Sequence, residues 1–153
     1  YSLFGWMIAS RQSDGRLHMR VNEKTVYQPR KKHHYNGNLY VLTGGFSFSA
    51  TTLFLNSMRK RHHFVQIGDE TGGGIRGNNA VMVPNLRLPN TGVSVRLPLF
   101  RLVTDYSLPH NGRGSFPQVY APATSHSIRY RYSPVISAAK QLVKESAKNK
   151  VNQ

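Results

Sequence analysis

The sequence predicts an α/β fold, with a mostly parallel sheet, helices on its faces and one antiparallel hairpin. Residues 39–67 read as strand, helix, strand, an order that normally makes the two strands parallel neighbours in one sheet. Residues 80–103 alternate apolar and polar side chains with period two, which is typical of half-buried strands. A last helix pattern follows Ser133-Pro134. With 153 residues and 39% hydrophobic residues, the chain is suited to one domain with one core.

The N-terminal stretch predicts a helix, a turn and a strand. Residues 1–10 (YSLFGWMIAS) have the apolar spacing of a helix end, Ser13-Asp14-Gly15 is a turn signal, and residues 17–21 alternate like a strand. Residues 29–38 (PRKKHHYNGN) are polar and basic, so we expect a loop. The opening apolar run is too short to span a bilayer and lacks a signal-peptide pattern. Since the chain begins without Met, inside an amphipathic pattern, we expect it to be a fragment.

The central segment predicts a strand–helix–strand unit. Residues 39–42 form a short apolar run of the kind found in buried parallel strands. Gly44-Gly45 then precedes a helix pattern over residues 49–61, which ends in basic residues that suit the helix dipole. Residues 64–67 are the second buried strand, and residues 68–74 (GDETGGG) form a glycine-rich loop.

The C-terminal half predicts a hairpin and a closing helix. Residues 89–92 (PNTG) supply the turn between the alternating segments of residues 80–103. Residues 111–114 (NGRG) are another loop. Ser133 is expected to cap the last helix with Pro134 at its first position, and residues 144–153 are expected to fray.

The composition limits the possible chemistry. The chain has no Cys, so disulfides and thiolate metal sites are excluded. It has 21 Lys and Arg against 6 Asp and Glu, a net charge of +15. Such a balance favours anionic partners, although a preceding acidic portion of a longer protein would offset it.

The strongest candidate for chemistry is the turn between the first central strand and the helix. A nucleophilic serine works best on such a sharp turn, where the helix N-terminus offers backbone N–H groups to an oxyanion. Gly44-Gly45 permits the turn, Ser47 and Ser49 lie at the helix start, and the small Ala50 leaves its N–H accessible. Taken alone, a Ser before a helix is usually an N-cap.

Four segments together resemble one enzyme family. LTGGFSFSATTLF, VQIGDETGGG, LRLPNTGVSVRLPLFRL and NGRGSFPQV stand in the order found in the tail-specific (C-terminal processing) serine peptidases, peptidase family S41. The likeness covers about residues 39–143. It implies a crotonase-like (ClpP/crotonase) core and hydrolysis of peptide bonds through an acyl-enzyme, with no cofactor.

The resemblance assigns roles by position. Ser49 matches the nucleophile, the Ala50 N–H matches one oxyanion donor, and Ser47 is the second choice as nucleophile. The other oxyanion donor belongs to a glycine-rich turn that would precede Tyr1. The resemblance makes the chain the C-terminal portion of a peptidase domain, acting on polypeptides. It implies a periplasmic or cell-envelope location.

The chain also departs from the family pattern. The general-base Lys of the Ser-Lys members is replaced by Gly74, so the chain looks closer to the tricorn-like branch, in which a His from a more N-terminal segment is the base. The expected acid is absent from residues 112–117. Asp105 is the nearest carboxylate, and Gln118 replaces the usual Asp. We therefore expect residues 1–153 alone to be inactive, and a catalytically impaired pseudo-peptidase is an alternative.

Other motifs favour structural readings. His33-His34 and His62-His63 are adjacent pairs whose side chains point apart, which disfavours a metal site. LPNTG at residues 88–92 matches a sortase-type sorting signal, but the apolar span such a signal needs is interrupted by arginines, so we interpret it as a hairpin turn. The glycine-rich loop lacks the Gly-Lys-Ser/Thr ending of a phosphate loop.

Two segments mix basic and aromatic residues as nucleic-acid surfaces do, RKKHHY at residues 30–35 and YRY at residues 130–132. Charge runs are usually solvated faces, so nucleic acid is an unfavoured partner. A basic binding module for nucleic acid or an anionic surface is nevertheless the alternative from another functional class.

Overall fold

Two units make up the chain, Tyr1–Asn36 and Gly37–Gln153. The computed structural model describes residues 9–13, 15, 17–19, 32–59, 63–80 and 82–151.

The first unit contains a small antiparallel hairpin. Strands β1 (Ala9–Arg11) and β2 (Leu17–Met19) pair with Ala9 opposite Met19. The Gly15 N–H donates to the Gln12 carbonyl at 3.0 Å, and Gly15 has φ 80°, so the predicted turn is confirmed. The predicted strand is confirmed through Met19, and residues 20–21 lie outside the described residues.

The helix predicted for residues 1–10 is wrong at its end, because Ala9 and Ser10 lie in β1. A short apolar run fits a helix or a strand equally well, and pairing with β2 decides the outcome here. Residues 1–8 lie outside the described residues. Within the loop predicted for residues 29–38, residues 32–38 contain no helix or strand.

A parallel sheet of three strands organises the second unit. Its order is β3 (Leu39–Thr43), β4 (Phe64–Gly68) and β9 (Val119–Tyr120). β3 and β4 pair in register from Leu39 opposite Phe64 to Thr43 opposite Gly68. The two predicted strands and their parallel pairing are therefore confirmed. The predicted fold class holds in its coarser form, a mixed α/β fold with a parallel sheet and additional antiparallel strands.

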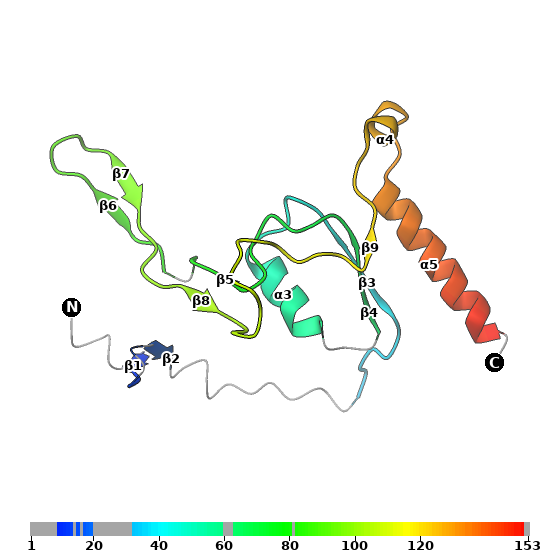
Figure 1. The fold of residues 1–153 in the computed structure, drawn as a ribbon, viewed down its shortest axis with the longest axis horizontal. Helices are drawn as coiled ribbons and strands as arrows, with labels where there is room; N and C mark the ends of the chain where they lie inside the picture. The colour runs from blue at the N-terminus through cyan, green and yellow to red at the C-terminus, as the bar shows by residue number, and fades with distance from the viewer. Residues whose placement is uncertain are drawn as a thin grey trace. The chain divides into compact units, whose positions relative to one another are not determined.

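Figure 1 shows this sheet between α3 (Ala50–Met58) and α5 (Pro134–Val151). The core is small: Leu55 of α3 and Ile67 of β4 are fully buried, with Phe64 and Ile75 close to that state. Helix α5 is joined to the start of β3 by a hydrogen bond from Asn38 Nδ2 to Ser146 Oγ, at 2.7 Å.

The helices differ from prediction at their ends. Helix α3 ends at Met58 with Arg59 as its C-cap, earlier than the predicted Arg61. Helix α5 continues to Val151, and the fraying expected for residues 144–153 stays a prediction. The short helix α4 (Ser125–Arg129) was not predicted, although the reciprocal capping of Thr124 and Ser127 is a local start signal.

The predicted hairpin is confirmed. β6 (Asn85–Arg87) pairs antiparallel with β7 (Ser94–Arg96), and the turn closes through the Gly92 N–H to the Leu88 carbonyl at 2.9 Å. Gly92 has φ 69°, which favours glycine. At its base, β5 (Gly77–Asn78) pairs with β8 (Leu102–Val103).

One side of this hairpin is an exposed apolar face, called here the ribbon face. Leu86 lies directly opposite Val95, and backbone bonds from Leu97 to Pro84 and from Leu99 to Met82 extend the same register. Alternate residues share a face. The large side chains of the ribbon face are all exposed: Met82, Leu86, Leu88, Val93, Val95, Leu97 and Leu99. Within the described residues, no helix is long and apolar enough to cross a membrane.

Candidate active site

A tight turn links β3 to α3. The Ser47 N–H donates to the Gly44 carbonyl at 2.8 Å, and the Gly44 N–H donates to Ser47 Oγ at 3.2 Å. The Ser47 hydroxyl therefore has a structural role within its own turn. This distinguishes Ser47 from Ser49, the two serines that the sequence offers as nucleophiles.

Ser49 occupies the N-cap position of α3 in an unusual backbone conformation. Its φ is 50° and its ψ is −111°, and its exposed side chain makes no capping hydrogen bond. For a residue other than glycine, such a conformation costs about 1–3 kcal/mol and is found mainly at functional sites. The Ser49 carbonyl is held by the Leu53 N–H at 3.1 Å and by Thr52 Oγ1 at 2.7 Å. The backbone is thus fixed while the hydroxyl is left exposed.

The Ala50 N–H follows Ser49 directly in the chain and is the first of α3. It donates to no acceptor among the residues that the structure describes. The first peptide N–H groups of a helix carry partial positive charge and favour an anion. The sequence-predicted pair, Ser49 and Ala50, therefore lies at one exposed helix end.

The glycine-rich loop packs directly against the Ser49 turn. The Gly73 N–H donates to the Ser47 carbonyl at 3.0 Å. A Cβ at Gly73 would lie 2.9 Å from Phe48 Cα and 3.2 Å from the Ser49 nitrogen, and a Cβ at Gly72 would lie 2.1 Å from a backbone oxygen. Glycine is required at both positions because the two backbones approach so closely.

Gly74, which the family resemblance matches to the Lys of the Ser-Lys peptidases, is in a different environment. A Cβ there would meet its nearest atom, the Gly77 oxygen, at 3.5 Å, which is ordinary contact. Gly74 also lines the same cavity as Ser49. A side chain at this position has room, so packing does not explain the glycine.

Buried polar residues tie the glycine-rich loop to the sheet and to residues 113–115. Ser115 Oγ donates to Gln66 Oε1 at 2.7 Å, and Gln66 Nε2 donates to the Ser115 carbonyl at 3.1 Å and to Thr43 Oγ1 at 3.0 Å. Thr71 and Ser115 exchange two further bonds, of 3.1 and 2.7 Å. Gln66 and Ser115 are almost completely buried, so these bonds fix the loop.

A second link between the same loops is ionic. Glu70 Oε2 pairs with Arg113 at 2.7 Å, and Glu70 Oε1 accepts the Gly114 N–H at 2.7 Å. Both oxygens of this carboxylate therefore have structural partners.

The two residues considered in place of the family's catalytic acid, Asp105 and Gln118, have other hydrogen-bond partners. Asp105 Oδ1 accepts the Ser107 N–H at 2.9 Å and the Ser107 hydroxyl at 2.6 Å. Gln118 Oε1 accepts the Gln66 N–H at 2.7 Å. Neither Asp105 nor Gln118 is among the residues that line the cavity beside Ser49.

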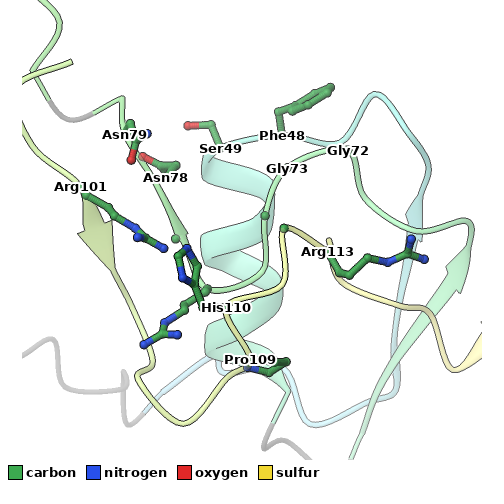
Figure 2. Close-up of a pocket in the computed structure, with 14 residues that line it drawn as sticks. Phe48, Ser49, Gly72, Gly73, Asn78, Asn79, Arg101, Pro109, His110 and Arg113 are labelled. Atoms are coloured by element: carbon green, nitrogen blue, oxygen red, sulfur yellow. The ribbon is translucent and has the colours of Figure 1, made fainter. Parts of the chain in front are cut away.

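That cavity, called here the Ser49 cavity, has a volume of about 530 Å³. Figure 2 shows the Ser49 side chain directed toward Asn78 and Asn79, with Arg101 and His110 facing one another farther along α3. The complete lining is Phe48, Ser49, Gly72, Gly73, Gly74, Arg76, Gly77, Asn78, Asn79, Arg101, Pro109, His110, Gly112 and Arg113. Sequence reasoning missed the polar lining residues other than Ser49, because they come from separate loops and form no local motif.

His110 is the one histidine among the described residues that line this cavity. The sequence had instead predicted that the catalytic base is a His outside the chain. Although both residues line the cavity, no hydrogen bond joins His110 to Ser49 in the described part of the chain. Elsewhere in the described ranges, no three His, Asp or Glu side chains gather into a group that could hold a metal. His62 lies outside the described residues.

A sequence model of peptidase family S41 matches residues 7–118, which include the Ser49 turn and the whole lining of the Ser49 cavity. The chain belongs to peptidase family S41. The family resemblance inferred from the four segments is thereby confirmed.

The S41 chain is also similar to a crystal structure of a candidate peptidase from Parabacteroides merdae. The TM-score is 0.58 with 32% sequence identity, and the likeness covers 74% of this chain and 34% of the other. The S41 chain thus spans about a third of the length of that protein. No protein of curated function matches it.

Proposed function

We propose that this S41 chain carries the nucleophile of a serine peptidase, with Ser49 forming the acyl-enzyme. The main support is the Ser49 conformation: a hydroxyl without a capping bond, at φ 50°, at the N-terminus of α3 and on an open cavity. A structural N-cap would direct its oxygen to the helix N–H groups instead.

The proposed reaction has two steps. Ser49 Oγ attacks the scissile carbonyl carbon as a base takes its proton, and the Ala50 N–H donates to the resulting oxyanion. The C–N bond then breaks and the amine leaves with the proton. Water attacks the Ser49 ester in the second step, which releases the acid and restores the hydroxyl.

The base is assigned by resemblance. Because Gly74 stands at the position matched to the general-base Lys, this chain cannot use the Ser-Lys mechanism. The tricorn-like branch, which the chain resembles more closely, uses a His from a more N-terminal segment as the base. We therefore assign the base to a His outside residues 1–153 and expect this chain alone to be inactive. The tail-specific character, the crotonase-like core, the periplasmic or cell-envelope location and the place of residues 1–153 within one peptidase domain belong to the same proposal.

A fluorophosphonate probe tests this function on the full-length protein that contains the sequence. Wild type and Ser47→Ala should be labelled, whereas Ser49→Ala should not. Ser47→Ala is the matched control because it removes a hydroxyl two residues away. Labelling that persists in Ser49→Ala would falsify the assignment, and absence of labelling in the wild type would favour a pseudo-peptidase.

A second candidate function is binding to an anionic polymer, favoured by an exposed cluster around α4. The His126 ring lies 4.5 Å from the Tyr130 ring and 5.8 Å from the Tyr132 ring, and both tyrosines are exposed beside Arg129 and Arg131. Such binding should weaken steeply as salt rises, whereas probe labelling should not.

A further inference from the structure

We propose that the Ser49 cavity binds a carboxylate of the peptide substrate through Arg101 and Arg76. This inference rests on the proposed peptidase function and names the substrate class for the same site. The carboxylate is either an acidic side chain near the scissile bond or the α-carboxylate of a peptide C-terminus.

The first support is the charge of the cavity lining. Three arginines and one histidine are among the 14 described residues that line it, and none of the 14 is an Asp or a Glu. A cavity lined by charge of one sign concentrates ligands of the opposite sign. Guanidinium groups also match the planar geometry of a carboxylate, to which they donate two parallel hydrogen bonds.

The three arginines are not equivalent. Arg113 is already neutralised by Glu70 at 2.7 Å, and its guanidinium carbon lies 5.1 Å from the centre of the Phe116 ring. Figure 2 shows Arg113 pointing away from Arg101 and His110. The other two arginines of the lining, Arg101 and Arg76, therefore supply the positive charge that no carboxylate of the described residues neutralises.

Arg101 and Arg76 form no ion pair with any residue in the described part of the chain. Figure 2 shows the exposed Arg101 side chain directed toward His110, within the cavity. Arg76 lies over the Tyr106 ring, with its guanidinium carbon 5.7 Å from the ring centre.

The Arg76 side chain supplies an independent observation. Its Nε is buried and has no hydrogen-bond acceptor among the described residues. A buried donor without an acceptor is destabilising by about 1–3 kcal/mol, and more for a charged group. A carboxylate that binds in the cavity gives this group an acceptor once the Arg76 side chain moves to expose its Nε.

The location identifies the anion as a carboxylate. The cavity adjoins the hydroxyl proposed to attack a peptide bond, and the anionic groups of an unmodified polypeptide are carboxylates. Its volume of about 530 Å³ lies in the range of ligand-binding pockets, roughly 300–1,000 Å³. The proposed peptidase therefore prefers substrates with an acidic group close to the cleaved bond.

The test compares matched peptides on the full-length protein. Cleavage sites in a peptide mixture are mapped first, and kcat/KM is then measured for each Glu peptide against its Gln isostere, and for each C-terminal acid against its amide. We expect a preference for the carboxylate of at least about tenfold, the size of one charge-assisted hydrogen bond. If kcat/KM falls when Glu is replaced by Gln in the peptide, the bound carboxylate is that of an acidic side chain. If kcat/KM falls when the C-terminus is amidated, the bound carboxylate is the α-carboxylate of the peptide.

The variants are Arg101→Gln, which should reduce the preference to near unity, and Arg101→Glu, which should reverse it. Arg96→Gln on the hairpin, outside the lining of the cavity, is the control and should leave the preference unchanged. Arg96→Gln should also keep wild-type labelling by the fluorophosphonate probe, because it changes neither Ser49 nor the cavity lining. Labelling of the two Arg101 variants is measured alongside and reports whether Ser49 is still reactive in them. Equal rates for carboxylate and neutral peptides, or an Arg101→Gln variant that keeps the preference, would overturn the proposal.

If the proposed peptidase function is wrong, the carboxylate subsite can still be tested by binding. If the wild type is neither labelled nor active, equilibrium binding of the same fluorescent peptides still tests the subsite. Carboxylate-dependent binding that Arg101→Gln abolishes supports the subsite without catalysis, and equal binding of acid and neutral peptides rejects it.

Discussion

The Gly73 N–H donates to the Ser47 carbonyl at 3.0 Å, two residues before the proposed nucleophile. This bond fastens the glycine-rich loop to the turn that presents Ser49. Because Gly73 also approaches Phe48 Cα and the Ser49 nitrogen, the loop acts as a backbone support for the turn.

Gly73→Ala should therefore damage the site, whereas Gly74→Ala should not. The new Cβ at Gly73 would meet backbone atoms at 2.9 and 3.2 Å, and crowding of this kind costs about 1–3 kcal/mol. At Gly74 the nearest atom is 3.5 Å away. Urea unfolding and the rate of probe labelling in the full-length protein measure both effects. Equal behaviour of the two variants would contradict the packing argument.

Ser49→Gly should stabilise the protein while abolishing labelling. Glycine adopts φ 50° without the steric penalty that serine experiences, but it also increases the entropy of the unfolded chain. The net expectation is a gain of about 1 kcal/mol in the free energy of unfolding. Ser49→Ala, which keeps the Cβ, is the comparison and should show no such gain. A less stable Ser49→Gly would mean that the Ser49 backbone is unstrained.

Ser115→Ala should destabilise the fold more than an exposed serine substitution does. It leaves Gln66 Oε1 buried without the donor that now lies at 2.7 Å, a loss of about 1–3 kcal/mol. Ser57→Ala, at an exposed position of α3, is the control and should stay within about 0.5 kcal/mol of wild type. Urea unfolding of both variants checks this. Two equal changes would show that the buried network contributes little.

Two substitutions at Glu70 separate its two interactions. Glu70→Gln keeps an acceptor for the Gly114 N–H but loses the ion pair with the largely exposed Arg113, so we expect a change within about 1 kcal/mol. Glu70→Ala also leaves the buried Gly114 N–H without its acceptor, at a cost of about 1–3 kcal/mol. The unfolding temperatures of the two variants show which substitution destabilises the protein more. If Gln is as damaging as Ala, the ion pair is the more important contact.

The ribbon face should bind an apolar dye. Leu86→Ser with Val95→Thr should reduce the fluorescence of bound anilinonaphthalene sulfonate, since both side chains are exposed on that face. The unfolding temperature should hardly change, because exposed side chains contribute little to stability. Asn85→Ser with Ser94→Ala, on the opposite face, is the control. Unchanged fluorescence in the first variant would place the dye elsewhere.

Sequence patterns predicted the elements whose signals are local. β3, α3 and β4 follow from apolar runs and the glycine turn, and the β6–β7 hairpin follows from period-two alternation around PNTG. The strands β5, β8 and β9 have two residues each, so they exist only through their partners and have no periodicity to detect. For Ala9 and Ser10, pairing with β2 overrode an apolar spacing that also fits a helix.

The residues of the candidate site likewise fall into those with a local sequence signal and those that come together only in the folded chain. Ser49 and Ala50 could be proposed from the sequence because a turn, a helix start and small residues lie together there. Arg76 and Arg101 were missed because they belong to different loops and meet only in the folded chain. The occupied hydroxyl of Ser47 could not be foreseen either, since it depends on the geometry of the 44–47 turn.

The support for Ser49 reaches far along the polypeptide. Ser47 is held by Gly73, Thr71 in the same loop is held by Ser115, and β4 pairs with β9 at residues 119–120. During translation, these contacts form only after residues 115–120 have left the ribosome exit tunnel. The turn that presents the proposed nucleophile is therefore completed only after residues far downstream of Ser49 have been synthesised.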